Sequence, residues 1–367
     1  MFILIPIKTL FTLKGAMHSA CQKKYRLYLI SLLSLCMMAL SSCAPPATQN
    51  IEHRATLVVF GTFVNILIFS PPSQSQQAET AIQTVEQQFQ QFHQQWHAWE
   101  QGGIVSKINQ AIQQQQPITV SDSVKQFILT SQTLTQQSQG LFDPAIGQLV
   151  SLWGFHSEAW HGPPPSSQKI QAWLNNAPSL LDISFTGNEL SSRNPSVQLD
   201  FGGNAKGLAI EMALTTLKRL GIQNAIVSIG GDMKAIGSKN GVPWRVGIQN
   251  PHNPNQVVAT IALQEGESVV TSGIYQRYFE WQGERFSHIL NPKTGYPAHS
   301  FASVTVLHSN AMTADAAATA LLVAGPKQWQ SIANSMGIQY MFALDEDGKK
   351  YQTEAMMQRI TRSLQAF

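Results

Sequence analysis

Two oxygen-bearing side chains lie four residues apart in an alanine-rich stretch, residues 313–319. Asp315 and Thr319 would project from one face of a helix, because residues i and i+4 are neighbours on its surface. A carboxylate and a hydroxyl one turn apart suit a hard cation such as Mg²⁺, with carbonyls, water or phosphate completing the coordination shell. The pattern also fits a capped helix whose threonine bonds to its own backbone, so both interpretations stay open.

A glycine-rich segment, residues 200–207, precedes a second helical stretch. Its paired glycines would let the backbone approach a ligand closely, and the start of a helix presents unbonded N–H groups to an anion. Lys206 places a positive charge at this point, which opposes the helix dipole unless an anion binds. The alternative is a glycine turn with a solvated lysine.

Two further turn-rich segments carry polar groups. Residues 287–297 combine His288 with an asparagine, a lysine and a threonine. A segment that only reverses the chain direction does not need this combination of reactive side chains. Residues 140–144 place Asp143 beside a proline, a pattern that also occurs at turns and helix caps. Together, an anion-binding turn, a lysine, two hard-metal donors and a histidine indicate phosphate-ester chemistry on a nucleotide.

Other reactive patterns carry less weight. The sequence lacks the motifs typical of dinucleotide-binding folds, P-loop enzymes, zinc proteases and α/β-hydrolases. His93 and His97 are also four residues apart, but glutamines surround them, so we expect both on a solvated helix face. The aromatic segment 153–156 is expected in the core.

The scaffold for these side chains is predicted from periodicity. Apolar residues at steps of three and four predict one long amphipathic helix over residues 78–99. Further helices are expected at 123–137, 207–220 and 312–323. A hairpin is expected at 57–60 and 65–69 around Gly61, and other strands at 225–229, 244–248, 257–263, 278–281, 303–308 and 340–344. Helices and strands without regular alternation predict an α+β fold with mixed sheets and flanking helices.

The positive charge of the chain is concentrated at its start. Among 367 residues there are 24 Lys and Arg and 21 Asp and Glu, a net charge of +3. Residues 1–42 hold five of the basic residues and no acidic one, so 19 basic residues remain against 21 acidic ones, a net charge of −2. We therefore expect no nucleic-acid partner of the kind that binds a basic patch.

The cysteines show the same division. Cys21 and Cys36 lie in residues 1–42, Cys43 follows directly, and residues 44–367 contain none. A disulfide framework, a zinc–thiolate site and a cysteine nucleophile are therefore excluded from the remainder of the chain.

Residues 1–42 have the pattern of an export signal. A lysine- and arginine-containing segment precedes the apolar run 27–40, and the Leu-Ser-Ser-Cys sequence ending at Cys43 resembles a bacterial lipobox. The alternative is an amino-terminal membrane anchor, but this run is shorter than the roughly 20 residues that a span needs. Residues 1–16 fit no part of a signal peptide, so we expect Met17 to be the true start.

Cys43 would then be acylated and tether the mature chain to a membrane by lipid. We expect residues 43–54 to form this lipidated tether and residues 55–367 the folded domain. The predicted location is the bacterial cell envelope, facing the periplasm. The outer membrane is favoured because Ala44 is not the aspartate that retains enterobacterial-type lipoproteins at the inner membrane.

Taken in their order along the chain, the four polar segments, 140–144, 200–207, 287–297 and 313–319, resemble the FAD:protein FMN transferase family of the ApbE type. Further matching segments precede them, at residues 60–62, Trp99 and 106–109, or lie between them, at 229–232 and 271–275. The resemblance implies a two-lobed body with a cleft for FAD and Mg²⁺ between the lobes. It also implies transfer of FMN from FAD to a Thr or Ser hydroxyl of envelope redox proteins, with release of AMP.

The resemblance also assigns roles to individual residues. His288 takes the position of the general base, and the metal ligands are Asp315, Thr319 and a carbonyl of the glycine turn, that of Gly203. The residues expected to line the FAD site are Phe60, Trp99, Leu141, Phe142, Asp143, Asp200, Lys206 and Ile289.

The sequence departs from the family pattern at four positions. Trp99 replaces a commoner tyrosine and Phe60 a usual methionine, while Glu211 and Asn291 each replace a frequent aspartate. Because Asn291 lacks a negative charge, it is expected to lower the basicity of His288. Two alternatives remain: a Mg²⁺-dependent FAD pyrophosphatase giving FMN and AMP, and a lipid-anchored flavin-binding protein.

Overall fold

A computed structural model describes residues 49–157 and 162–362. From Asn50 onward, the described residues form one compact unit. The expected signal peptide, the Met17 start and the lipidation site Cys43 lie outside the described residues. Within the described ranges, no helix combines the length and the apolar character needed to cross a membrane.

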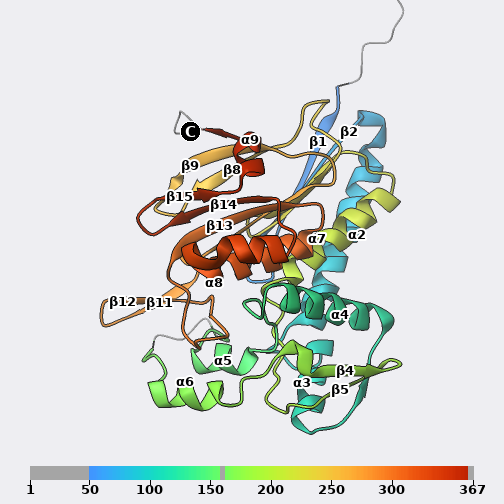
Figure 1. Cartoon of the computed structure of the whole chain (residues 1–367). Coiled ribbons are helices and arrows are strands. Elements are labelled where there is room, and N and C mark those ends of the chain that lie inside the picture. The colour runs from blue at the N-terminus through green and yellow to red at the C-terminus, as the bar shows by residue number, and fades with distance from the viewer. Residues whose placement is uncertain (1–48, 158–161, 363–367) are drawn as a thin grey trace, which may run out of the picture. The chain divides into compact units, whose positions relative to one another are not determined.

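An eight-stranded sheet forms the centre of the fold (Figure 1). In spatial order its strands are β1 (Ile51–Val59), β2 (Thr62–Ser70), β6 (Ala225–Ile229), β7 (Asp232–Ile236), β10 (Ser268–Gly273), β13 (Phe301–His308), β14 (Tyr340–Asp345) and β15 (Lys350–Gln352). Every ladder between these strands is antiparallel. Strand β13 is buried along all but its last residue because layers cover both faces of the sheet.

The β1–β2 and β6–β7 turns each contain two residues in the left-handed conformation. The φ angles are 60° and 67° at Phe60 and Gly61, and 59° and 96° at Gly230 and Gly231. Two positive φ angles form the kind of turn whose twist matches that of antiparallel strands. The Gly230 N–H donates to the Phe63 carbonyl at 3.0 Å, which places the two turns side by side at one end of the sheet.

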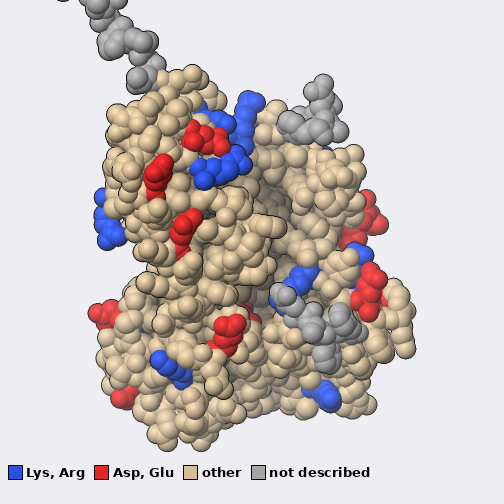
Figure 2. All heavy atoms as spheres, turned by 180° about the vertical axis from the view of Figure 1, so that it is seen from behind, with Lys and Arg blue, Asp and Glu red and all other residues tan. Residues whose placement is uncertain are grey.

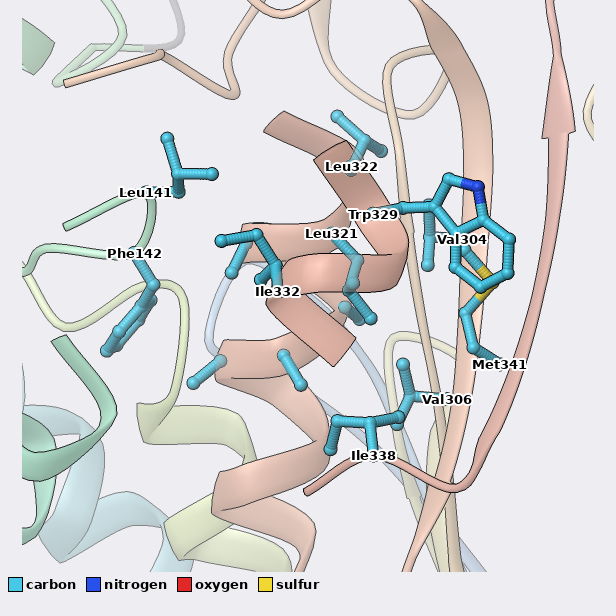
Figure 3. Close-up of a cluster of buried hydrophobic side chains, with 14 of the residues drawn as sticks. Leu141, Phe142, Val304, Val306, Leu321, Leu322, Trp329, Ile332, Ile338 and Met341 are labelled. Atoms are coloured by element: carbon cyan, nitrogen blue, oxygen red, sulfur yellow. The ribbon is translucent and has the colours of Figure 1, made fainter. Parts of the chain in front are cut away.

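One face of the sheet is covered by helices α2 (Ser75–Trp96), α7 (Ala205–Arg219) and α8 (Ala311–Ser335). Helices α2 and α7 pack on β2 and β6, and α8 packs on β10 and β13. Figure 3 shows the second of these contacts, where Leu321 of α8 meets Val304 and Val306 of β13. The other face is covered by β8 (Arg245–Asn250), β9 (Asn253–Ala262), α9 (Glu354–Arg359) and β16 (Ile360–Arg362).

Helices α7 and α8 come into close contact at Gly207. A Cβ atom at this position would lie 2.5 Å from the Ala311 carbonyl oxygen, so only glycine fits without displacing a helix. Helix α8 begins at Ala311, where the Asn310 side chain caps the Thr313 N–H at 2.9 Å. This contact brings the first turn of α7 beside the first turns of α8.

The remaining elements form two smaller hydrophobic clusters beyond the ends of α2 and α8 (Figure 1). The first contains α3 (Ile104–Gln113), β3 (Ile118–Thr119), α4 (Asp122–Gln137), η3 (Leu180–Asp182), β4 (Ile183–Thr186) and β5 (Glu189–Ser192). The second contains α5 (Gly147–Leu152), α6 (Ser167–Leu174), β11 (Tyr278–Trp281) and β12 (Glu284–Ser287). The short helix η2 (Pro72–Gln74) links β2 to α2.

The α+β class is confirmed, but the prediction of mixed sheets is wrong, since every ladder between named strands in the described part is antiparallel. The predicted helix 78–99 ends at Trp96 because His97 adopts an extended backbone with ψ 122°. The expected tether, 43–54, overlaps β1, which begins at Ile51 and pairs with β2 from its first residue.

Candidate active site

A cavity of about 570 Å³ is lined by the β1–β2 turn, the end of α2 and the first turns of α7 and α8. Its size falls in the usual range for small-molecule sites, roughly 300–1,000 Å³. Figure 2 shows a face of the molecule that is largely uncharged and hollowed across its middle. All twelve residues that the resemblance assigned to FAD, metal or base line the cavity: Phe60, Trp99, Leu141, Phe142, Asp143, Asp200, Gly203, Lys206, His288, Ile289, Asp315 and Thr319.

Lys206, in the first turn of α7, lies between two buried carboxylates. Its Nζ atom forms an ion pair with Asp232 and lies 3.8 Å from Asp315 Oδ1. The Thr271 N–H donates to Asp232 Oδ1 at 3.0 Å, and the Gly207 N–H donates to Asp315 Oδ2 at 3.1 Å. Each carboxylate is therefore held by a backbone donor as well as by the lysine.

This cluster carries more negative than positive charge when both carboxylates are ionised. Burial raises the pKa of Asp315, and the negative charge of the neighbouring Asp232 raises it further. Although the positive charge of Lys206 lowers it, the pKa of Asp315 is raised to about 6. Burial would lower the pKa of Lys206, but the two carboxylates outweigh that effect and raise it above its ordinary value. A permanently charged ammonium and a surplus carboxylate therefore face the cavity together.

The donors available for a metal are hard oxygens. Within the described residues no three His, Cys, Asp or Glu side chains converge to form a metal site. Asp315 and Thr319 lie one turn apart on α8, and a Cβ atom on Gly203 would lie 3.7 Å from Thr319 Oγ1. Gly207 lies in the first turn of α7, where backbone N–H groups have no acceptor within the helix, and its N–H binds Asp315. Gly203 precedes the N-cap residue Asn204, so its carbonyl lies outside the helix. A carboxylate, a hydroxyl and a carbonyl outside the helical bonding pattern fit Mg²⁺.

His288 follows β12 and is fixed by a backbone contact. Its Nδ1 atom lies 2.9 Å from the Arg277 carbonyl oxygen, and its own N–H donates to the same oxygen at 3.1 Å. A carbonyl only accepts hydrogen bonds, so Nδ1 carries the proton and Nε2 keeps its lone pair. Burial lowers the pKa of His288, and the positive charges of Arg277 and Lys206 lower it further. The hydrogen bond to the Arg277 carbonyl raises it, and the resulting pKa is about 4. The imidazole is therefore neutral at neutral pH.

Aromatic rings form the wall near the end of α2. The Trp99 Nε1–H donates to Asp200 Oδ2 at 3.1 Å, and Asp200 Oδ1 accepts from the Gly202 N–H at 2.9 Å. Phe60, at the β1–β2 turn, lies edge-on to Phe92 of α2 with ring centroids 5.8 Å apart. Asp200 therefore couples the aromatic wall to the glycine turn that precedes α7.

Leu141, Phe142 and Ile289 form the apolar part of the wall. All three are buried and belong to the cluster centred on α8, where Figure 3 shows Leu141 and Phe142 beside that helix. A Cβ atom on Gly203 would lie 3.1 Å from the Phe142 ring, so the glycine turn lies directly against this wall.

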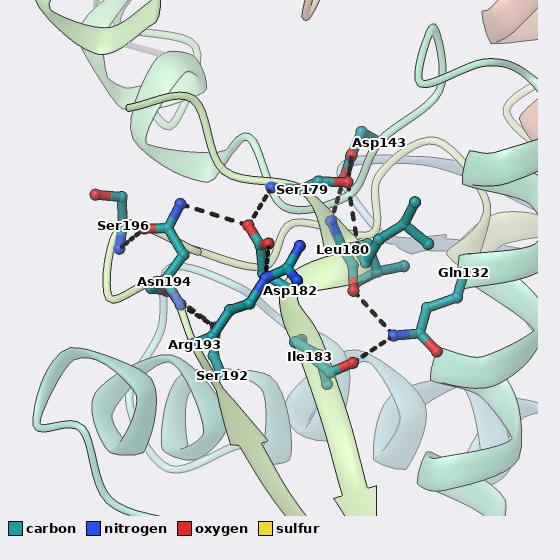
Figure 4. Close-up of polar contacts among 11 residues, drawn as sticks. Gln132, Asp143, Ser179, Leu180, Asp182, Ile183, Ser192, Arg193, Asn194 and Ser196 are labelled. Atoms are coloured by element: carbon teal, nitrogen blue, oxygen red, sulfur yellow. Dashed lines mark hydrogen bonds and ion pairs between the residues drawn. The ribbon is translucent and has the colours of Figure 1, made fainter. Parts of the chain in front are cut away.

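The Asp143 carboxylate is directed into the protein (Figure 4). It accepts hydrogen bonds from Ser179 Oγ at 2.7 Å and from the N–H groups of Leu180 and Ala145, both at 2.9 Å. Burial raises the pKa of Asp143, while these donors and nearby Lys293 oppose the rise. Although Asp143 lines the cavity, its carboxylate ties the segment before η3 to the loop after α4.

Two of the departures from the family pattern make hydrogen bonds that hold neighbouring elements in place. Glu211 binds Lys234 Nζ at 2.6 Å and accepts from the Ala311 N–H at 2.6 Å, so it fixes the start of α8 to α7 and β7. Asn291 Oδ1 accepts from the Lys293 N–H at 2.8 Å, the contact of an Asx turn. Both side chains therefore support the elements that carry Asp315 and His288.

Sequence reasoning missed several residues of this site. His93 and His97, expected on a solvated face, are half-buried and line the cavity, because α2 ends there and its last turns face the β1–β2 turn. Arg277 also lines it. Asp232 lies within a segment that matches the family, but the resemblance assigned it no function. Its ion pair with Lys206 joins residues 26 positions apart, and local sequence patterns do not predict contacts over that separation.

The fold and cavity define a class: an α+β protein with a cavity in which a lysine, hard-oxygen donors and a neutral histidine face an aromatic wall. The chain belongs to the ApbE family, whose profile matches residues 60–342.

Individual relatives support this membership. The FAD:protein FMN transferase of Rhodobacter capsulatus is 38% identical over 305 residues, covering 83% of this chain and 58% of that protein, so the chain spans less than two thirds of that relative. The Vibrio cholerae protein of the same name is 30% identical over 330 residues, covering 89% and 96%.

Solved structures agree in fold. The ApbE protein of Thermotoga maritima has a TM-score of 0.77 at 29% identity, covering 84% of this chain and 99% of that one. The flavinyl transferase ApbE of Pseudomonas stutzeri, in its apo form, has a TM-score of 0.74 at 29% identity, covering 85% and 98%.

Proposed function

We propose that this protein transfers FMN from FAD to a Thr or Ser hydroxyl of an acceptor protein, forming a phosphoester bond and releasing AMP in a Mg²⁺-dependent reaction. The observation that carries the proposal is the placement of His288, Lys206 and the Asp315–Thr319 pair around one cavity. The names of the relatives from R. capsulatus and V. cholerae support the same reaction.

The cavity offers distinct surroundings for the two parts of FAD. The aromatic and apolar wall, with Trp99 and Phe60, suits a flat ring system. Lys206 and the first turn of α7 suit the pyrophosphate, because an ammonium and helical N–H groups both favour negative charge.

A Mg²⁺ ion would be held by Asp315, Thr319 and the Gly203 carbonyl. When bound, it offsets negative charge on the pyrophosphate as a Lewis acid. The residual negative charge of the Lys206–Asp232–Asp315 cluster supports this assignment, since a divalent cation neutralises it.

The transfer step uses His288 as a general base. The acceptor oxygen forms a bond to the phosphorus of the FMN half, the bond from that phosphorus to the bridging oxygen breaks, and this oxygen departs with AMP. The hydroxyl proton passes to His288 Nε2, the nitrogen that carries the lone pair. Lys206 stabilises the charge that develops on the phosphate oxygens.

One incubation tests the proposal. The mature chain is combined with FAD and Mg²⁺, with and without a candidate envelope redox protein as acceptor, while AMP release and flavin fluorescence on a denaturing gel are followed. A fluorescent acceptor supports transfer, AMP without acceptor supports a pyrophosphatase, and bound flavin with neither product supports a storage protein.

A pair of histidine variants sharpens this test. His288→Asn is expected to slow transfer by roughly 10²- to 10⁴-fold through loss of the base. His299→Asn, which changes an exposed histidine outside the cavity, is expected to retain the wild-type rate. Equal rates for both variants would remove His288 from the mechanism.

We further propose that Cys43 is acylated and that the protein faces the periplasm as a lipoprotein, with the outer membrane as its expected location. The lipobox-like sequence before Cys43 supports this proposal. Labelling cells with an alkyne fatty acid should mark the wild-type chain but not a Cys43→Ser variant, and membrane fractionation should assign the location.

A further inference from the structure

The loop between α2 and α3, residues 97–103, begins with a histidine that bonds to the loop itself. His97 Nδ1 accepts two backbone hydrogen bonds, from the Trp99 N–H at 3.2 Å and the Glu100 N–H at 3.0 Å. One acceptor atom therefore shapes the first turn after α2, in the way that an aspartate or asparagine side chain does in an Asx turn.

The ring of His97 is itself held in place. Since Nδ1 accepts, the neutral ring carries its proton on Nε2, which lies 3.9 Å from Glu100 Oε1. The ring meets His93, one turn earlier on α2, edge to face with centroids 5.3 Å apart. His97 is thus oriented by the helix and by the loop that it caps.

The far end of the loop is fixed by close packing. A Cβ atom on Gly103 would lie 2.5 Å from the Gln94 carbonyl oxygen and 2.6 Å from that of Gln95, so the chain folds back against the end of α2. In the middle, Trp99 binds Asp200 through Nε1. The loop is thus held by the His97 bonds, by the Trp99–Asp200 bond and by the packing of Gly103. A substitution at His97 removes the first of these and leaves the Trp99 ring and Gly103 unchanged.

We propose that His97 is a positioning residue for the flavin site. Its Nδ1 atom fixes the backbone at Trp99, so that the indole faces the cavity with its Nε1 directed to Asp200. His97 therefore sets the affinity for FAD and leaves the rate of the chemical step unaffected. The identity of the ligand rests on the proposed function, whereas the ordering of the loop does not.

Three variants test the inference. His97→Ala removes the acceptor, His97→Asn supplies an oxygen near the position of Nδ1, and Glu100→Gln removes only the neighbouring charge. The first readout needs no flavin: amide hydrogen exchange at Trp99 and Glu100 should quicken at least tenfold in His97→Ala. It should return towards the wild-type rate in His97→Asn and stay at that rate in Glu100→Gln.

The second readout compares binding with turnover. In His97→Ala, the Kd for FAD from calorimetry and the KM for FAD should each rise about tenfold, while kcat stays within about twofold. His97→Asn should recover most of the affinity, and Glu100→Gln should match the wild type. If His97→Ala fails to fold, His97→Gln, whose amide reaches the Nε2 rather than the Nδ1 position, takes its place.

The outcomes separate this inference from the proposed function. Unchanged exchange and unchanged FAD affinity in His97→Ala would overturn the inference, as would a fall in kcat with unchanged KM. A wild-type protein that binds no FAD would overturn the proposed function and the flavin part of the inference. The exchange rates would still decide whether His97 orders the loop.

Discussion

His288 donates a hydrogen bond from Nδ1 to the Arg277 carbonyl at 2.9 Å, while the Arg277 side chain binds the Phe155 carbonyl at 2.7 Å. The same arginine therefore fixes the tautomer of the histidine through its backbone and places a positive charge near the ring through its side chain. The first effect keeps the lone pair on Nε2, and the second lowers the pKa of the imidazole.

The pH dependence of transfer follows from this pair. Only neutral His288 accepts a proton, and protonation occurs as the pH falls through its pKa of about 4. At saturating FAD, and at a Mg²⁺ concentration high enough to keep Asp315 ionised below its own pKa of about 6, the rate should stay level down to about pH 5 and then decline, whereas an ordinary histidine would cause a decline near pH 6.5. The Arg277→Gln variant should move the acid limb to higher pH, because it removes a repelling charge. A limb that stayed in place would contradict the role assigned to this arginine.

Asp315→Asn should weaken the response to Mg²⁺. Removing a residue that hydrogen-bonds to a metal ligand typically lowers metal affinity roughly 10- to 100-fold, and removing the ligand itself should lower it at least as much. The measurement is the Mg²⁺ concentration that gives half-maximal transfer. Ser272→Ala is the matched control, because Ser272 Oγ contacts Thr319 Oγ1 at 3.2 Å and should change this concentration less. Identical activation curves for wild type and Asp315→Asn would refute the metal assignment.

Asp143→Ala should destabilise the protein. The substitution leaves the buried Leu180 N–H and its neighbouring donors without an acceptor, at a cost of about 2–3 kcal/mol in the free energy of unfolding. Thermal unfolding should show a Tm lowered by several degrees. The remaining folded protein should keep its wild-type Mg²⁺ dependence, and a changed dependence would indicate that the carboxylate acts on the ligand.

Gly207→Ala should reverse the usual effect of this substitution in a helix. Alanine is normally favoured over glycine by about 1 kcal/mol at a helical position. Here the added Cβ would lie 2.5 Å from the Ala311 carbonyl oxygen and force α7 away from α8. Denaturant titration should give a lower free energy of unfolding than that of wild type. Gly102→Ala offers a comparison, because nothing lies within 4 Å of its Cβ position and the cost there comes from backbone strain alone.

Local sequence patterns predicted those elements whose shape depends on local interactions. The hairpin around Gly61 and helix α7 lie close to their expected ranges, because turn chemistry and apolar periodicity act over a few residues. The helix predicted over 312–323 ends close to a break at Gly325 (φ 61°, ψ −174°), after which α8 resumes through Pro326. The pattern thus located a real interruption and missed the continuation.

Features that depend on contacts between distant segments were not predictable in this way. The periodicity of α2 continues to Trp99, yet the helix ends at Trp96, where the His97 ring caps the following turn and Gly103 packs on the last carbonyls. The partner of Lys206 in the sheet and the inward direction of the Asp143 carboxylate are likewise products of tertiary packing. The family resemblance identified the cavity residues because it carries this long-range information.

The close contact of α7 with α8 at Gly207 has a consequence for the life of the protein in the cell. Because Lys206, Asp232 and Asp315 come together only when both helices are seated on the sheet, an unfolded or partly folded chain has no comparable site. A ligand that binds only the native state stabilises it by RT ln(1 + [L]/Kd), about 2.7 kcal/mol at a hundredfold excess over Kd. Under the proposed function this ligand is FAD, so the supply of FAD would then change the fraction of unfolded chain that proteases can attack.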